Sequence, residues 1–95
     1  MLYKYQAHDV TRVRREEIAI KETARLIEKI SIEINNCIDK GKFFLVYKYE
    51  FNFAETPGFT ILQNSLTYFQ KLEYEIDYDC KRYGETYLYE ITIGW

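Results

Sequence analysis

Residues 10–38, VTRVRREEIAIKETARLIEKISIEINNCI, decide the fold. A mostly apolar seam recurs there in alternating steps of three and four, which predicts one long amphipathic helix. At 1.5 Å per residue the helix reaches roughly 45 Å, whereas a compact domain of this length measures about 30 Å across. Part of the helix must therefore overhang, break or lie against another molecule. This geometry favours association over catalysis.

The predicted helix has a face broad enough to cover a sheet. Its main stripe consists of Val13, Ile20, Ala24, Ile27, Ser31, Ile34 and Ile38, widened by Leu26, Ile30 and Cys37. Gly41 suits the left-handed position just past the end of the helix. The start stays open, because an N-cap at Asp9 or Thr11 places arginines in the first turns, where the helix dipole disfavours cations. Either the regular helix begins nearer Glu16, or these arginines face an anion.

Downstream of the helix the apolar period changes three times. Residues 43–53 alternate as a half-buried strand, and Thr56-Pro57 begins a second helix of about four turns. Residues 73–79 and 87–95 alternate again around a turn at residues 81–84. The order α-β-α-β-β predicts an α+β fold, a three-stranded antiparallel sheet with two helices on one face. We place the last strand in the middle and the acid-rich strand from Glu73 to Asp79 at an edge.

Length and composition indicate a single domain over residues 1–95, with nearly half of the residues apolar and a net charge of −2. Residues 1–8 suit an N-terminal arm or a short added strand, and the pattern does not choose between them. The net charge gives no general attraction to nucleic acid or to an anionic membrane. Cys37 and Cys80 have no metal-type spacing, which favours reduced thiols in a cytoplasmic protein. No run of residues is long and apolar enough to span a membrane.

Catalytic groups are hard to assemble from this sequence. The single histidine, His8, lies near the start, and the serines have no neighbouring base, so we expect no enzyme activity and no cofactor. A row of acids on one sheet face, with Glu90 beside it, is typical of a solvated edge strand rather than of a metal site. The row consists of Glu73, Glu75, Asp77 and Asp79.

The strongest polar cluster is the RVRR segment, which contains Arg12, Arg14 and Arg15. Planar guanidinium donors beside a helix start suit phosphate. The alternative is that these side chains pair with acids of a partner chain or with nearby glutamates of the helix: Glu16, Glu17 and Glu22. If the cluster holds a phosphate-bearing ligand, Tyr3 or Tyr5 is the expected stacking group.

Six tyrosines share the predicted core face of the sheet: Tyr47, Tyr49, Tyr74, Tyr78, Tyr87 and Tyr89. They either place their hydroxyls at the rim of the core or line a cleft in which a base stacks. Ile18 and Ile32 lie more than about 90° from the main stripe of the first helix, on a side that the sheet cannot cover. These two residues predict an interface, and a homo-oligomer formed through the long helix.

Four segments resemble small uncharacterised proteins of tailed bacteriophages: residues 34–42 (INNCIDKGK), 66–72 (LTYFQKL), 74–78 (YEIDY) and 91–95 (ITIGW). The pattern departs at Glu73, where those proteins usually have glycine before the aromatic residue. The resemblance implies a virus-encoded accessory protein, many of which neutralise a host defence protein or its nucleotide signal. It supplies no functional residues.

The sequence thus predicts a non-enzymatic, self-associating accessory protein that sequesters a phosphate-bearing nucleotide of host antiviral defence. The alternative is a protein-directed inhibitor of a host protein, or an assembly adaptor, acting through the long helix. Nucleic-acid binding is a second alternative, which the acidic pI argues against. No membrane partner is expected.

Overall fold

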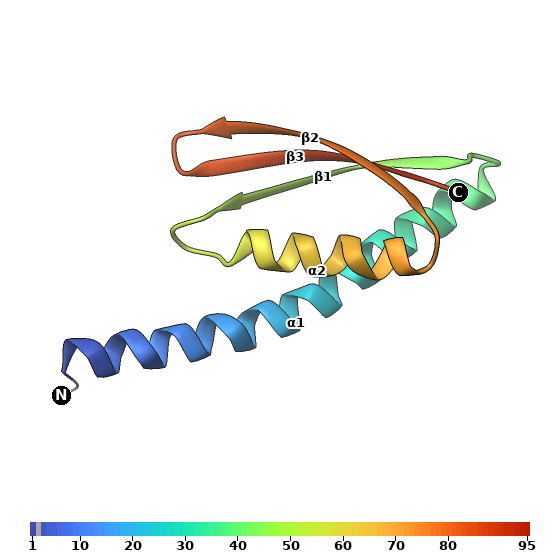
Figure 1. Cartoon of the computed structure of the whole chain (residues 1–95). Coiled ribbons are helices and arrows are strands. Elements are labelled where there is room, and N and C mark those ends of the chain that lie inside the picture. The colour runs from blue at the N-terminus through green and yellow to red at the C-terminus, as the bar shows by residue number, and fades with distance from the viewer. Residues whose placement is uncertain (2) are drawn as a thin grey trace.

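The computed structural model describes residue 1 and residues 3–95. Its elements follow in the order α1 (Lys4–Asp39), β1 (Phe44–Asn52), α2 (Gly58–Lys71), β2 (Glu75–Tyr83) and β3 (Thr86–Gly94). The predicted α+β architecture is confirmed, with both helices on the same side of the sheet (Figure 1).

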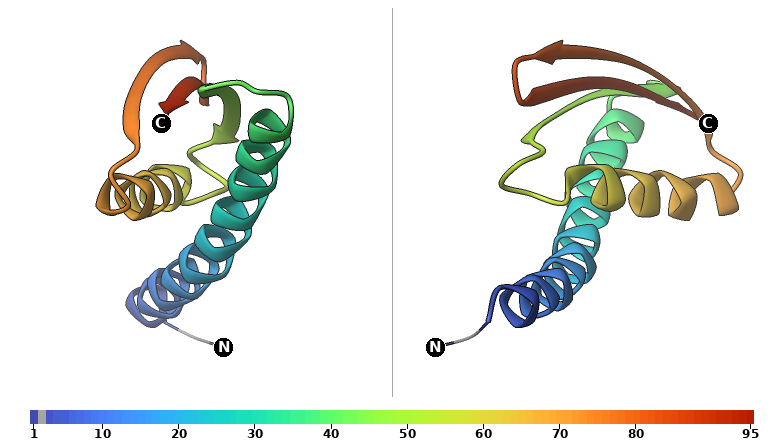
Figure 2. Two further views of the ribbon diagram at one scale, coloured as in Figure 1. Left: turned by 90° about the vertical axis from the view of Figure 1, so that its right-hand side faces the viewer. Right: turned by 60° about the vertical axis from the view of Figure 1, so that its left-hand side comes forward.

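The sheet has the strand order β1-β3-β2, and both pairings are antiparallel. The predicted central position of the last strand is confirmed: Ile91 of β3 lies opposite Tyr47 of β1 and Tyr78 of β2. Ile91 and Ile93 are fully buried, because strands flank β3 on both sides and the helices cover its inner face (Figure 2). The acid-rich β2 forms an edge, as predicted.

The turn between β2 and β3 is shorter than predicted. Residues 81–83 belong to β2, and Tyr83 pairs with Thr86 across the two-residue turn Gly84-Glu85. Gly84 has φ 62° and Glu85 does not have a positive φ, the pattern of a type II′ hairpin turn. The predicted turn at 81–84 was wrong because Lys81 and Arg82 were interpreted as turn residues, whereas an exposed edge strand tolerates charged side chains equally well.

The core lies between the two helices and the inner face of the sheet. Its buried hydrophobic residues are Ala19, Leu26, Ile30, Ile34, Leu45, Phe51, Ile61, Leu62, Leu66, Phe69, Ile91 and Ile93.

The face of α1 that contacts the core overlaps the predicted main stripe only in part: Ile34 is buried, and Ile27 and Ser31 are half-buried. Val13, Ile20, Ala24 and Ile38 are exposed, whereas the flanking residues Leu26 and Ile30 form the centre of the contact. Apolar residues of this helix fall on two overlapping stripes, so periodicity alone cannot select which of them faces the sheet.

Helix α1 neither breaks nor is fully covered by its own domain. It begins at Lys4, so a start nearer Glu16 was wrong, and residues 4–8 of the suggested arm are helical; residue 2 lies outside the described residues. Among the described residues of α1, none before Ala19 is buried. The molecule measures 57 × 26 × 18 Å with a radius of gyration of 15.8 Å, against about 12 Å for a compact chain of this length. The first turns overhang the domain (Figure 2).

Both helices end in the same type of cap. Gly41 has φ 74°, and Lys42 N–H donates to the carbonyl of Cys37 at 2.9 Å, as predicted for a glycine at this position. At the end of α2 the corresponding residue is Glu73, with φ 70°, and Tyr74 N–H donates to the carbonyl of Phe69 at 3.2 Å. A residue with a Cβ therefore occupies a left-handed position that favours glycine.

Replacing Glu73 by glycine is expected to stabilise the protein. The left-handed conformation costs an L-residue roughly 1–2 kcal/mol, and the extra freedom of glycine in the unfolded chain offsets about 0.5–1 kcal/mol of this. We expect the free energy of unfolding, measured in urea, to rise by about 0.5–1 kcal/mol. Glu73→Ala is the control, because alanine keeps the Cβ; an equal gain in that variant would show that the Glu73 carboxylate, not its backbone, is unfavourable.

Candidate anion-binding groove

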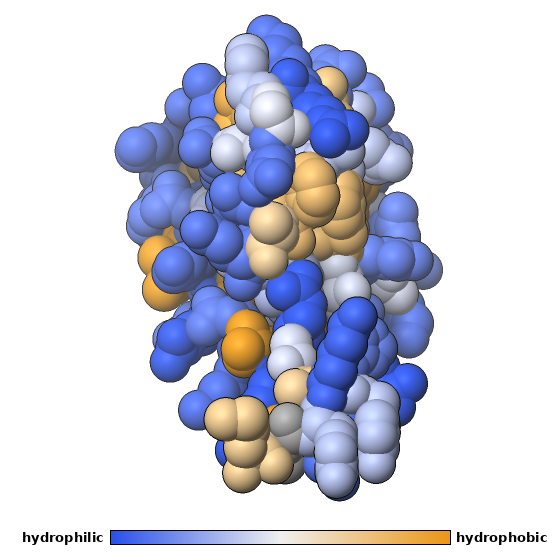
Figure 3. Space-filling view, turned by 90° about the vertical axis from the view of Figure 1, so that its left-hand side faces the viewer, coloured by the Kyte–Doolittle hydropathy of each residue, from blue (hydrophilic) through white to orange (hydrophobic). Residues whose placement is uncertain are grey.

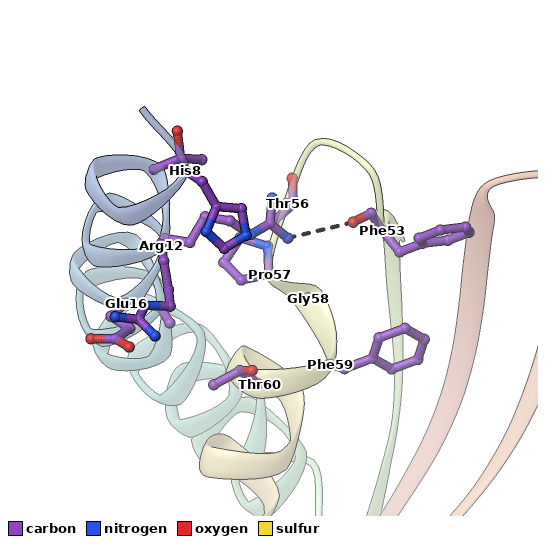
Figure 4. A pocket seen from close by; sticks show the side chains of 12 residues that line it. His8, Arg12, Glu16, Phe53, Thr56, Pro57, Gly58, Phe59 and Thr60 are labelled. Carbon is purple, nitrogen blue, oxygen red and sulfur yellow. Dashed lines mark hydrogen bonds between the residues drawn. The ribbon is translucent and has the colours of Figure 1, made fainter. Parts of the chain in front are cut away.

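A groove of about 420 Å³ lies between the overhanging part of α1 and the start of α2. In Figure 3, which views the end of the molecule where α1 begins, an apolar patch lies within mostly hydrophilic surface. Figure 4 shows the groove from close by. Its lining residues are His8, Thr11, Arg12, Arg15, Glu16, Ala19, Phe53, Thr56, Pro57, Gly58, Phe59 and Thr60.

The basic side chains of the groove continue the core face of α1. From buried Ala19 towards the N-terminus, steps of four, three and four residues lead to Arg15, Arg12 and His8. These spacings keep side chains on one face of a helix. Beyond Ala19 that face meets the start of α2 instead of the core (Figure 4). The helix face that carries apolar residues from Ala19 onward therefore carries Arg15, Arg12 and His8 in the first turns of α1.

The opposite wall of the groove is the N-terminal end of α2. The N-cap residue is Pro57, and within the described chain no side chain caps the first turn. Gly58 N–H donates to the carbonyl of Thr56 at 2.8 Å. The N–H groups of Phe59 and Thr60 have no carbonyl within the helix to receive them, and they carry the positive end of the helix dipole. The wall therefore presents hydrogen-bond donors suited to an anion.

Arg15 is anchored across the groove. Its Nη2 donates to the carbonyl of Phe53 at 3.5 Å, the contact drawn in Figure 4. Phe53 belongs to the loop after β1, and Asn52 orders this loop: its Oδ1 accepts a hydrogen bond from Ala54 N–H at 2.9 Å. Glu16 is the one acidic residue of the lining, and its carboxylate points away from Thr56 and Pro57. The nitrogen donors of His8 and Arg15 thus lie on the side of the groove next to the loop after β1 and the start of α2.

The structure separates the residues that the sequence placed in one site. Arg12 and Arg15 line the groove, whereas Arg14 pairs with Glu17 at 3.0 Å on exposed surface. Tyr3 and Tyr5 stack on each other with ring centroids 5.8 Å apart, outside the lining. Pairing with glutamates, the alternative interpretation, therefore applies to Arg14.

Sequence reasoning missed His8 and the polar residues of the second wall. His8 extends from α1 towards Thr56 and Pro57 (Figure 4). The spacing of His8, Arg12 and Arg15 at i, i+4 and i+7 was the available signal. Thr56 and Thr60 come from a segment 41 or more residues away from Arg15, and only the packing of α2 against α1 brings them to the groove.

Most of the six tyrosines predicted for the inner sheet face lie at the rim of the core. Tyr47, Tyr49, Tyr74, Tyr87 and Tyr89 are half-buried, and Tyr78 is exposed. Burial raises the pKa of Tyr47, with Glu33 adding to the effect. Burial together with contact to Cys80 raises the pKa of Tyr89 to about 12. These hydroxyls therefore stay neutral near neutral pH.

The two isoleucines of the predicted interface are both exposed, with Ile18 45% and Ile32 52% accessible. Ile32 borders a groove of about 390 Å³ beside β1, together with Val46 and Tyr47. Charged side chains separate the two isoleucines along α1, among them Lys21, Arg25 and Glu28. The two isoleucines are therefore separate exposed apolar residues rather than one continuous apolar surface.

Two further properties bear on the class of site. Within the described residues, no group of His, Cys, Asp or Glu is arranged to hold a metal ion. In the same part of the chain, no helix combines the length and the apolar character needed to cross a membrane. Comparison of the chain with protein-family models, curated proteins and solved structures found no match.

Proposed function

We propose that this protein is a non-enzymatic binder of a phosphate-bearing ligand, and that the phosphate lies in the groove between α1 and α2. The observation that carries the proposal is that Arg15, whose Nη2 lies 3.5 Å from the Phe53 carbonyl, lines the same groove as an α2 start that no described side chain caps. Arg12 adds a guanidinium and His8 an imidazole on the same helix face. The groove, at about 420 Å³, is larger than a single inorganic phosphate needs, so it also has room for part of the group that carries the phosphate.

Titration calorimetry of the wild-type protein with pyrophosphate tests the phosphate site directly. Pyrophosphate carries the charge and the acceptor oxygens without a base or a sugar. Saturable binding that weakens with rising salt supports the site, because ion contacts are screened. Absence of heat and of any protection against thermal unfolding at millimolar pyrophosphate would contradict it.

Self-association is the second part of the proposal, and it rests on an exposed, mostly apolar strip that begins on the overhang and continues past Ala19. We name this strip the outer stripe; its exposed apolar members are Val10, Val13, Ile20 and Ala24, and Glu17 lies between Val13 and Ile20. Ile20 is 72% accessible, an unusual exposure for an isoleucine. Residues 4–15 carry four Lys or Arg and one Asp, whereas residues 16–39 carry six acids and three Lys or Arg. Antiparallel pairing of two α1 helices would cover the stripe and match these charges.

Aspartate at both Val13 and Ile20 is expected to convert an oligomer into a monomer. Each substitution would place a charge in a contact that excludes water. Light scattering coupled to gel filtration measures the mass of the wild-type protein and of the variant. Ile18→Asp/Ile32→Asp is the matched comparison. If only that variant loses mass, the interface lies where the sequence placed it, and a monomeric wild-type protein would contradict self-association on either face.

The phage origin and the target in host antiviral defence remain predictions of the sequence resemblance. A protein-directed inhibitor would bind a host chain through α1 and give no response to phosphate ligands. Nucleic-acid binding would show an affinity that falls steeply with salt and grows with polymer length. The same calorimetric series separates these alternatives from the proposed small ligand.

A further inference from the structure

A second groove, of about 360 Å³, lies between α2 and the inner face of the sheet, next to the edge strand β2. Its lining residues are Phe59, Leu62, Gln63, Leu66, Thr67, Gln70, Tyr78 and Tyr89. The anion-binding groove does not use these residues, with the exception of Phe59. The composition combines aromatic rings with side-chain amides.

The sheet side of this groove is aromatic. Tyr78 and Tyr89 lie with their ring centroids 5.7 Å apart and tilted by 52°, and Phe59 meets Tyr89 edge to face at 6.4 Å. Tyr78 is 57% exposed. Such a surface offers a planar ring a face on which to stack.

The helix side of the groove is polar. Gln63, Thr67 and Gln70 follow each other at i, i+4 and i+7, which places them on one face of α2. Each glutamine amide offers both a donor and an acceptor, the combination that reads the edge of a nucleobase. The Tyr89 hydroxyl, like that of any tyrosine near neutral pH, is protonated and can serve as a further donor.

Phe59 connects the two grooves. It is the second residue of α2, and it lines both the anion-binding groove and the aromatic groove. Its backbone N–H belongs to the uncapped helix start, while its ring points away from α1 towards the sheet (Figure 4). A ligand whose phosphate lies beside Arg15 would therefore pass the side chain of Phe59 on its way into the second groove.

We propose that the groove between α2 and β2 holds the nucleobase of the ligand whose phosphate occupies the anion-binding groove. The ring stacks on Tyr78, and the amides of Gln63 and Gln70 bind its polar edge. This inference rests on the proposed function for the position of the phosphate. The residues that would bind the base do not line the anion-binding groove. The ligand class narrows accordingly from phosphate compounds in general to nucleotides.

Calorimetry with pyrophosphate, ribose 5-phosphate and the diphosphates of adenosine, guanosine, cytidine and uridine tests the assignment. At least one nucleoside diphosphate should bind about fivefold or more tightly than pyrophosphate, since stacking of one base is worth about 1–3 kcal/mol. Gln63→Ala/Gln70→Ala and Tyr78→Ala should each reduce this ratio towards one and leave the pyrophosphate affinity unchanged. All three residues are exposed enough to be replaced without loss of the core.

Two results would overturn the inference. One is that no nucleotide binds more tightly than pyrophosphate; the other is that the ratio is the same in the wild-type protein and in both variants. Gln63→Ala also has a matched control in Asn64→Ala, one residue along α2 and outside the groove, which should change nothing. If pyrophosphate fails to bind but a free nucleoside binds and Tyr78→Ala removes it, the phosphate site is wrong and the base site stands.

Discussion

Replacing Arg15 by alanine is expected to weaken pyrophosphate binding by about 10- to 100-fold, because a charge-assisted hydrogen bond contributes roughly 1.5–3 kcal/mol. Arg15 is half-buried between α1 and the loop after β1, and this burial, with a long contact of 3.5 Å to the Phe53 carbonyl, limits its rotamer freedom before any ligand arrives. A restrained guanidinium loses less entropy on binding than an exposed one. Arg12→Ala should have a smaller effect, since Arg12 is exposed. Titration calorimetry at low and at moderate salt measures both.

Arg14→Ala is the matched control for this prediction. It removes the same charge from the same turn of α1, but from a side chain that pairs with Glu17 outside the groove. Its effect on binding should stay within about twofold, as is usual for a screened charge at the surface. Equal losses in Arg14→Ala and Arg15→Ala would show that net charge, not the groove, attracts the ligand. That result would favour a site formed by all three arginines of the RVRR segment, as the sequence predicts.

Periodicity was sufficient for the architecture because each element carries its own local signal. Phe43 to Phe53 alternates at period two, and Gly41 marks the end of α1 where its left-handed conformation is required. The central position of β3 followed from Ile91 and Ile93, the residues best suited to burial on a flanked strand. The same reasoning failed on α1, where Ile20 and Ile30 belong to overlapping apolar stripes, and only contacts with α2 and β1 decide between them.

The candidate site was predicted only in part because its two walls are distant in the chain. The basic wall carries a readable signal, and sequence reasoning found Arg12 and Arg15. The sequence prediction also included Arg14, because residues that are neighbours along the chain can point to different faces of a helix. The other wall begins at Pro57, whose importance lies in lacking a capping side chain. An uncapped helix start becomes part of a binding groove only when another helix or strand packs beside it. Sequence patterns do not show which elements pack together.

Gly58→Ala is expected to lower the free energy of unfolding by about 2–3 kcal/mol, the upper range for overpacking of a core. A Cβ at Gly58 would lie 2.1–2.6 Å from ring atoms of Phe51, well inside van der Waals contact. Phe51 is itself buried and cannot swing away freely, since its ring packs edge to face against Phe59 at 4.9 Å. Urea unfolding followed by circular dichroism measures the loss.

The control is Gly94→Ala, where the added Cβ meets its nearest neighbour, the Cβ of Glu75, at 3.8 Å and the free energy of unfolding should change little. The double variant Gly58→Ala/Phe51→Leu should be more stable than the sum of its two single changes, because the smaller side chain removes the clash. Simple additivity would show that Phe51 is not the obstacle. Since Gly58 begins α2 and Phe51 supports Phe59, the single variant should also weaken pyrophosphate binding under conditions in which it remains folded. Unchanged affinity in the folded variant would mean that the start of α2 does not hold the anion, and that the arginines of α1 bind it alone.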